Sequence, residues 1–174
     1  MKIAIIGYSG SGKSTLARKV AEEYQIPVLH FDRVQFRPNW EIRPQQSKEV
    51  MTKAFLDLHD SWVIDGNYSK LYFERRMAEA DVIILLLFNK ISCLYRVTWR
   101  YLKYKDSSRP DMADGCKEKL DWEFIKWILR DGRTKESRQR YNGVVARYPE
   151  KTIVIKNQRQ LNGAQKRIEE LRRK

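Results

Sequence analysis

The segment Gly7-Tyr8-Ser9-Gly10-Ser11-Gly12-Lys13-Ser14 decides how the rest of this chain is interpreted. It matches the phosphate-binding pattern G-x-x-x-x-G-K-[ST] at every fixed position. A short apolar run from Lys2 to Ile6 precedes it, and apolar residues at helical spacing follow it from Lys13 to Gln25. A glycine-rich turn between a strand and a helix directs backbone N–H groups and the positive helix end toward phosphate oxygens. The alternative interpretation is a glycine-rich turn with a surface lysine.

The motif assigns chemical roles to individual positions. We expect Lys13 to contact the β- and γ-phosphates of ATP, and the Ser14 hydroxyl to be a ligand of Mg²⁺. The positions expected to bind the nucleotide are Gly7, Ser9, Gly10, Ser11, Gly12, Lys13, Ser14 and Thr15. ATP and Mg²⁺ are therefore the predicted cofactors.

Short apolar segments elsewhere in the chain indicate further buried strands. With the first run they are Lys2–Ile6, Pro27–Phe31, Trp62–Ile64, Val82–Phe88 and Thr152–Ile155. Because they show no polar alternation and are separated by helical segments, they predict an α/β fold with a parallel sheet covered on both faces. The chain has 174 residues, the length of one domain, so we predict a single domain over residues 1–174.

Residues 90–148 interrupt this alternation of strands and helices. They are mostly helical and rich in Arg, Trp and Tyr, so we expect a helical insert that closes over the nucleotide as a lid. Within it, Arg96 and Arg100 are candidates for stabilising charge on the transferred phosphoryl group. Arg109, in the loop from Asp106 to Cys116, is a second lid candidate for the nucleotide. A helical cap with solvated cations is the alternative.

Apolar spacing predicts which helix faces pack on the core. In the helix after Pro44 the expected face is Met51, Ala54, Phe55 and Leu58. In the first helix of the insert it is Ile91, Tyr95, Trp99 and Leu102, opposite a cationic face. In the next helix it is Leu120, Phe124, Trp127 and Ile128.

Two carboxylates follow predicted strands. Asp32 ends the second strand and Asp65 follows the third, on the edge where parallel sheets bind ligands. A carboxylate at that edge can hold a Mg²⁺ water or accept a proton from an acceptor hydroxyl. We assign Asp32 as the base, and Asp65 with Ser14 to the metal. The exchange of these roles, and a purely structural role as capping residues, are the alternatives.

Positive charge is concentrated in the second half of the chain. Lys and Arg number 35 and Asp and Glu 22, which gives a net charge of +13. Residues 1–89 contain 12 basic and 11 acidic residues, and residues 90–174 contain 23 and 11. Such a field attracts nucleotides, phosphorylated metabolites or nucleic acid. The chain ends in a cluster of cations: Lys166, Arg167, Arg172, Arg173 and Lys174.

Other protein classes are disfavoured. The longest apolar run, Val82–Phe88, is far shorter than the roughly 20 residues that span a bilayer, so we predict no membrane segment. Cys93 and Cys116 have no paired spacing, which argues against a disulfide scaffold or a zinc site and favours the reducing cytoplasm. The oligomeric state is left open.

Several of these segments resemble known families. The phosphate-binding loop, Asp65-Gly66 and the Arg-rich insert are similar to small nucleoside, nucleotide and shikimate kinases. More narrowly, bacterial DNA topology modulation proteins resemble this chain at His30-Phe31-Asp32-Arg33, Arg37-Pro38-Asn39-Trp40, Trp62-Val63-Ile64-Asp65-Gly66-Asn67-Tyr68, Arg109-Pro110-Asp111 and Leu120-Asp121. The resemblance implies a three-layer P-loop NTPase fold like that of adenylate kinase, with a five-stranded parallel sheet in the order 2-3-1-4-5.

The resemblances imply two functions. The first is an ATP- and Mg²⁺-dependent kinase that transfers the γ-phosphate to a nucleoside, nucleotide or other small acceptor, with Lys13, Asp32, Arg96 and Arg100 as catalytic residues. In nucleoside monophosphate kinases Asp-Gly continues Phe-Pro-Arg, and the Arg binds the acceptor's phosphate, whereas here Asp65-Gly66 continues Asn67-Tyr68-Ser69. The missing Arg argues against a monophosphate acceptor and leaves a hydroxyl-bearing acceptor open; replacement of this Arg by Arg33 or Arg37 is the alternative. The alternative is a nucleotide-dependent DNA-binding protein; weak electrostatic DNA binding is expected in either case. A nucleotide sensor without turnover is a third interpretation.

Overall fold

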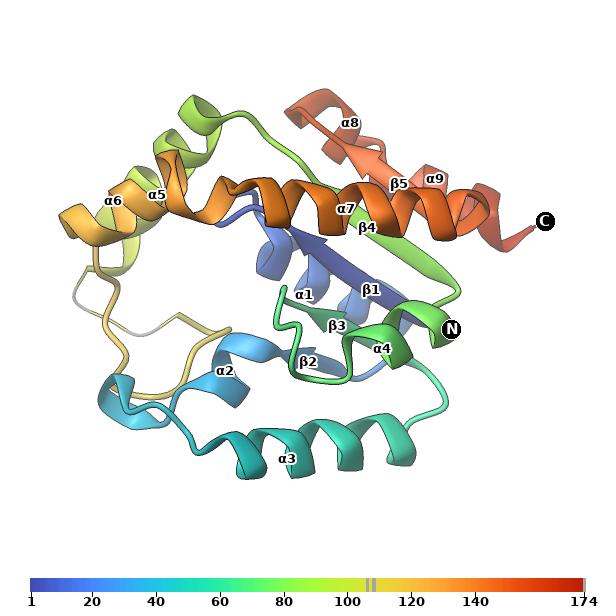
Figure 1. The fold of residues 1–174 in the computed structure, drawn as a ribbon, viewed down its shortest axis with the longest axis horizontal. Coiled ribbons are helices and arrows are strands. Elements are labelled where there is room, and N and C mark those ends of the chain that lie inside the picture. The colour runs from blue at the N-terminus through green and yellow to red at the C-terminus, as the bar shows by residue number, and fades with distance from the viewer. Residues whose placement is uncertain (106, 108, 174) are drawn as a thin grey trace.

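The central sheet follows directly from the apolar segments of the sequence. The structure, a computed structural model, describes residues 1–105, 107 and 109–173; Asp106, Ser108 and Lys174 lie outside the described residues. The strands are β1 (Lys2–Gly7), β2 (Val28–His30), β3 (Trp62–Asp65), β4 (Val82–Leu86) and β5 (Thr152–Ile155). They form one all-parallel sheet in the order β2-β3-β1-β4-β5, which confirms the predicted fold (Figure 1).

Helices cover both faces of this sheet. They are α1 (Lys13–Tyr24), α2 (Phe31–Gln35), α3 (Gln45–Leu58), α4 (Phe73–Glu79), α5 (Lys90–Tyr104), α6 (Trp122–Leu129), α7 (Lys135–Arg147), α8 (Gln158–Asn162) and α9 (Ala164–Arg172), with 3₁₀ turns at Pro38–Trp40, Asp131–Arg133 and Pro149–Lys151. In Figure 1, α4 and α7 lie in front of the sheet and α1 behind it. Because both faces are covered, β1 and β4 need no polar residues, and their centres are completely buried.

The second strand is shorter than the sequence predicts. β2 ends at His30, and Phe31 already begins α2. Asp32 therefore lies in the first turn of a helix and does not end a strand, whereas Asp65 is the last residue of β3. A buried aromatic residue before an acid has the same appearance in sequence whether it closes a strand or opens a helix.

The predicted apolar face of α5 is wrong. The stripe that was expected in the core is exposed: Ile91 80%, Tyr95 63%, Trp99 58% and Leu102 57%. The helix packs instead through Cys93 and Val97, both fully buried. These small side chains let α5 rest on the phosphate-binding loop itself, where a Cβ on Gly10 would lie 2.7 Å from Val97 Cγ2 and 2.8 Å from the Cys93 carbonyl.

The predicted face of α3 is right only for Phe55, which is half-buried and packs against the core, and wrong for Met51, Ala54 and Leu58. Met51 and Leu58 are 38% and 78% exposed, and the residues that face inward are Lys48, Thr52 and Leu56. Thr52 is tolerated there because its hydroxyl donates a 2.7 Å hydrogen bond to the Lys48 carbonyl. A count of apolar residues cannot identify a buried face that is partly polar.

The next helix, α6, agrees only in part. Ile128 is buried, Leu120 before the helix and Phe124 within it are half-buried, and Trp127 is 49% exposed.

Within the described residues, no helix combines the length and apolarity needed to cross a bilayer.

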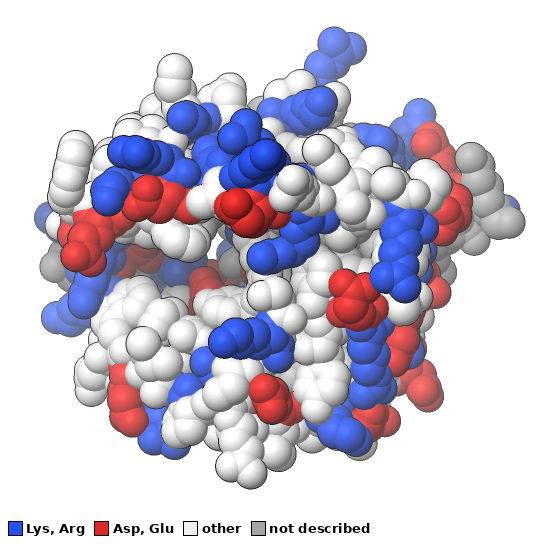
Figure 2. Space-filling view, in the orientation of Figure 1, with Lys and Arg blue, Asp and Glu red and all other residues white. Residues whose placement is uncertain are grey.

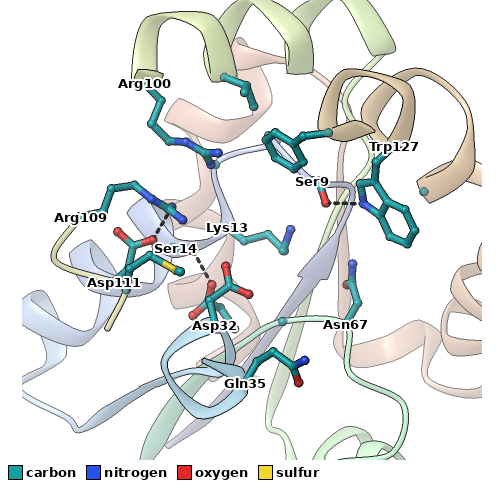
Figure 3. Close-up of a pocket in the computed structure, with 18 of the residues that line it drawn as sticks. Ser9, Lys13, Ser14, Asp32, Gln35, Asn67, Arg100, Arg109, Asp111 and Trp127 are labelled. Carbon is teal, nitrogen blue, oxygen red and sulfur yellow. Dashed lines mark hydrogen bonds and ion pairs between the residues drawn. The ribbon is translucent and has the colours of Figure 1, made fainter. Parts of the chain in front are cut away.

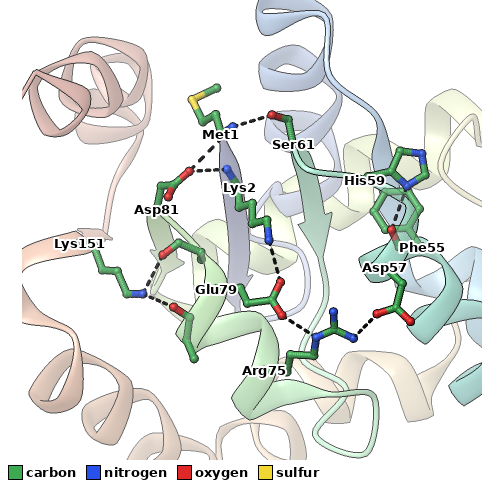
Figure 4. Close-up of polar contacts among 12 residues, drawn as sticks. Met1, Lys2, Phe55, Asp57, His59, Ser61, Arg75, Glu79, Asp81 and Lys151 are labelled. Carbon is green, nitrogen blue, oxygen red and sulfur yellow. Dashed lines mark hydrogen bonds and ion pairs between the residues drawn. The ribbon is translucent and has the colours of Figure 1, made fainter.

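Polar contacts tie together the amino ends of the strands, at the opposite edge from the phosphate-binding loop (Figure 4). The Met1 ammonium donates to Ser61 Oγ at 2.6 Å, which joins the start of β1 to the residue before β3. Glu79 accepts from both Lys2 and Arg75, and Arg75 also pairs with Asp57 of α3. This network holds α3 and α4 against the amino end of the sheet.

Candidate active site

The phosphate-binding loop adopts the turn that its glycines predict. Gly7 ends β1 with a φ of +138°, and a Cβ there would lie 2.2 Å from the Leu86 carbonyl oxygen. A side chain cannot fit at this position, because β1 and β4 approach each other too closely. The loop then enters α1 at Lys13, so the positive end of a twelve-residue helix faces the loop.

The Lys13 side chain folds back over the phosphate-binding loop. Its ammonium donates a 3.0 Å hydrogen bond to the Tyr8 carbonyl, and Figure 3 shows the side chain reaching into the centre of the pocket. Burial lowers the pKa of Lys13 below its usual value, and the carboxylates of Asp65 and Asp32 act in the opposite direction. Phosphate oxygens in the loop would stabilise the charged form further.

Ser14 and Asp65 are brought together as the sequence predicts. The Ser14 hydroxyl donates a 2.7 Å hydrogen bond to Asp65 Oδ2, while His30 Nδ1 lies 2.5 Å from Asp65 Oδ1. One hydroxyl and one carboxylate are the hard oxygen donors that Mg²⁺ takes when phosphate and water complete its shell. In the described part of the chain no group of three or more His, Cys, Asp or Glu residues forms a protein cage for a metal. The residues present therefore fit a magnesium ion shared with a nucleotide.

Asp32 faces the same cavity from α2. The Tyr68 hydroxyl donates a 2.9 Å hydrogen bond to Asp32 Oδ1. Burial, together with the nearby Asp32 charge, raises the pKa of Tyr68, so the phenol remains a donor at neutral pH. This contact fixes the orientation of the Asp32 carboxylate.

The loop after β3 is joined to the phosphate-binding loop. Asn67 Oδ1 accepts from the Gly7 backbone N–H at 2.9 Å, and Asn67 Nδ2 donates to the Gly7 carbonyl at 2.6 Å. Arg76 holds the other side of this loop by donating to the carbonyls of Gly66, Tyr68 and Leu71. Arg76 is fully buried, and burial lowers its pKa to about 9.

These groups border one cavity of about 1700 Å³. It is lined by Ser9, Gly10, Gly12, Lys13, Ser14 and Thr15 of the loop and helix α1, by Asp32 and Asp65, and by Arg96, Arg100 and Arg109. Gly7 and Ser11 lie behind this surface, and the Ser11 hydroxyl donates to the Tyr8 carbonyl at 2.6 Å. Figure 2 shows the hollow at the left of the molecule, between the insert helices and the α2 region.

The three arginines of the predicted lid have different surroundings. Arg96 packs over the Phe88 ring, 4.3 Å from its centroid, and bonds to Gln158 Oε1. Its Nη1 is the nearest atom, at 3.0 Å, to the Cβ that a side chain at Gly12 would have. Arg96 therefore stands directly beside the phosphate-binding loop.

Arg100 and Arg109 are paired with acids. Arg100 lies 2.5 Å from Glu118, and Arg109 lies 2.6 Å from Glu118 and 2.7 Å from Asp111. The Glu118 and Arg109 side chains are 3% and 9% exposed, so this pair is buried. Figure 3 shows Arg100, Arg109 and Asp111 at one wall of the cavity. Burial, then the nearby Arg109 charge, lower the pKa of Arg100.

Four residues at the site have roles that the sequence did not reveal. Trp127 Nε1 donates to Ser9 Oγ at 3.1 Å, although spacing placed this indole in the core. His30, Asn67 and Tyr68 hold Asp65, Gly7 and Asp32 respectively. For His30 the signal lies in the pairing of β2 with β3, where His30 and Asp65 are register partners, but this register can be derived only once the strand order is known.

The comparison with solved structures supports the fold. No family model and no curated protein matches the chain. Among solved structures it is similar to a deoxyadenosine kinase from M. mycoides with the products dCMP and a flexible dCDP bound (14% identity, TM-score 0.55, covering 98% of this chain and 100% of that one). It is also similar to an uncharacterized protein from Eubacterium ventriosum (17%, 0.55, 100% and 99%) and to the M. mycoides enzyme with dATP bound (14%, 0.53, 97% and 100%).

At these identities the similarity shows the fold, which is that of the P-loop kinases. The narrower resemblance to DNA topology modulation proteins has no support from these comparisons and stays a prediction.

Proposed function

We propose that the protein transfers the γ-phosphoryl group of ATP to a hydroxyl group of a small acceptor. The observation that carries this proposal is the single cavity that joins the phosphate-binding loop to the Asp32 carboxylate. A carboxylate held in the same cavity as the phosphate site is placed to accept the proton of an acceptor hydroxyl. The named kinases among the solved structures support the same reaction class.

The geometry suggests how the residues divide the work. Lys13 and the backbone N–H groups of the loop bind and orient the phosphates, and Arg96 adds positive charge beside them. Asp32 accepts the proton of the acceptor hydroxyl while the acceptor's oxygen forms the new bond to the γ-phosphorus. The bond between the γ-phosphorus and the β,γ-bridging oxygen breaks, and ADP leaves. Ser14 and Asp65 would hold Mg²⁺, which would neutralise charge on the phosphates.

The basic half of the chain is the observation that favours the alternative, nucleotide-dependent DNA binding. However, several of its cations are used internally. Arg100 and Arg109 pair with Glu118, and Arg133 donates to the Ile128 and Phe88 carbonyls. Lys and Arg are also interspersed with Asp and Glu on the face seen in Figure 2. These arrangements favour the kinase.

A screen of ATP consumption tests the proposal. Purified protein with Mg²⁺ is offered nucleosides, nucleotides and sugar acids, with the Lys13→Ala variant as the blank. Turnover stimulated by one of these acceptors, and absent in the variant, supports the kinase. Stimulation by DNA alone would transfer the support to the alternative.

We also propose a cytoplasmic location, supported by the two free and buried thiols, Cys93 and Cys116.

A further inference from the structure

The acceptor side of the cavity is built by α2 and the first turns of α3. Asp32 and Gln35 are three residues apart on α2, so they share one face of this helix. Both line the cavity, together with Gln45 and Lys48 of α3. Figure 3 shows the Gln35 side chain below Asp32, with its amide nitrogen turned toward the interior and its oxygen turned away.

Lys48 is an unusual residue for this wall. It is only 8% exposed, and its ammonium donates a 2.9 Å hydrogen bond to Gln35 Oε1. Among the residues that the structure describes, no carboxylate lies within 4.0 Å of this ammonium. A buried lysine is normally paired with an acid, because an isolated charge is costly to desolvate. An ammonium has three donor positions, and Gln35 uses one of them.

The position of Lys48 in its helix adds an independent observation. The first turn of the fourteen-residue helix α3 contains no acid, and its N-cap, Pro44, offers no side-chain hydrogen bond. The positive charge of Lys48 therefore lies near the positive end of the helix dipole, where a cation destabilises the helix. Helix stability does not explain a buried cation here, whereas binding of an anion does.

We propose, on the basis of the function proposed above, that Lys48 and Gln35 bind an anionic group of the phosphoryl acceptor, either a carboxylate or a phosphate. Lys48 holds the Gln35 oxygen, which leaves the Gln35 N–H₂ group as a second donor toward the same ligand. Charge-assisted hydrogen bonds of this kind are stronger than neutral ones. Asp32 lies within one helical turn of Gln35, so the acceptor would carry its hydroxyl and its anionic group close together. The acceptor class is therefore a small hydroxylated anion and not an uncharged nucleoside.

Anion binding beside a filled nucleotide site tests the proposal. The protein is saturated with Mg²⁺ and a non-hydrolysable ATP analogue, so that phosphate cannot enter the loop. Inorganic phosphate and acetate are then titrated at constant ionic strength, with affinity measured by calorimetry and by the shift in melting temperature. The variants are Lys48→Met and Gln35→Glu, whose new carboxylate would pair with Lys48. Lys53→Met is the matched control, because Lys53 lies on α3 with an exposed side chain paired to Asp57.

We expect both variants to bind the preferred anion about tenfold more weakly or worse, and the control to match the wild type. The anion whose affinity falls distinguishes a phosphate acceptor from a carboxylate acceptor. Equal anion affinity in wild type and both variants would overturn the inference, even if Lys48→Met melts at a lower temperature. If Lys48→Met does not fold, the anion affinity of Gln35→Glu, which retains Lys48, still tests the inference. Binding of the ATP analogue reports separately on the proposed function: failure of anion binding alone overturns this inference, and failure of both overturns both proposals.

Discussion

Arg100 and Glu118 are held 2.5 Å apart at the cavity wall, with only 3% of the Glu118 side chain exposed. Glu118 also pairs with Arg109, which Asp111 contacts as well, so Glu118 is the carboxylate shared by the two arginines that the sequence predicts beside the nucleotide. A carboxylate buried between two cations contributes to stability mainly because its removal leaves charges unpaired.

Replacement of this carboxylate therefore has a large expected effect. Glu118→Gln should lower the free energy of unfolding by on the order of 3 kcal/mol, measured by urea denaturation. Glu74→Gln is the control, since Glu74 forms an exposed ion pair with Arg147 and such pairs contribute about 1 kcal/mol or less. Similar small losses in both variants would mean that the buried network is not a structural tie.

Lys13→Ala should abolish turnover and weaken ATP binding while the protein remains folded. The side chain contacts the loop and not the apolar core, so the melting temperature should stay near that of wild type. Lys19→Ala, an exposed change on the same helix, is the control. Normal ATP consumption by a folded Lys13→Ala protein would show that the loop is not a working phosphate site.

The two carboxylates should separate in their effects. Asp32→Asn should lower turnover by roughly 10²-fold or more with little change in ATP affinity, as expected for a lost base. Asp65→Asn should instead reduce the Mg²⁺ dependence of nucleotide binding, because Asp65 accepts the hydrogen bond from Ser14. Turnover and ATP titrations with and without Mg²⁺ measure both effects. The reverse pattern would exchange the two roles, and near-normal rates in both variants would make them structural.

The network in Figure 4 predicts a pH dependence of stability. Burial alone would raise the pKa of Glu79, but hydrogen bonds from Arg75 and Lys2 lower it below its usual value of 4.5. The stabilisation is therefore present above about pH 4.5 and is lost as the pH falls through the lower, folded-state pKa. Melting temperatures of wild type and Glu79→Gln should differ at pH 6 and converge as the pH falls through the folded-state pKa of Glu79. A constant difference across this range, or one matching the exposed change Glu22→Gln, would contradict the prediction.

DNA binding should be weak and sensitive to salt. A protein with a net charge of +13 is expected to bind DNA non-specifically, with Kd values of roughly 10⁻⁴ to 10⁻⁶ M, and to lose affinity steeply as salt rises. Neutralising Lys166 and Arg167 should weaken this binding more than it affects turnover, and Arg96→Ala should do the opposite. Fluorescence anisotropy at 50 and 200 mM salt measures the first effect. Tight, ATP-dependent binding at the higher salt would favour the DNA-linked function.

The phosphate-binding loop and the buried strands could be predicted from sequence because each is a local pattern. Five apolar runs and one glycine motif sufficed for the parallel sheet, and Ser14 and Asp65 meet as expected. The orientation of α5 could not be predicted in this way. Its packing is decided by the contact of Cys93 and Val97 with Gly10, which are more than eighty residues away in the chain.

The acceptor side was missed for a related reason. Lys48 reads as a surface charge in any hydropathy pattern, and only the position of Gln35 makes its burial intelligible. Similarly, the pairing of Arg100 and Arg109 with Glu118 joins α5 to a loop that has no local sequence signal. Such contacts depend on tertiary structure, which spacing rules do not contain.

The two hydrogen bonds between Asn67 and Gly7 have a mechanical consequence. They fix the loop after β3 to the backbone at the end of β1, where the phosphate-binding loop begins. These two segments of the cavity wall therefore move together. Widening of the gap between the loop after β3 and the phosphate-binding loop would therefore have to break two hydrogen bonds at once.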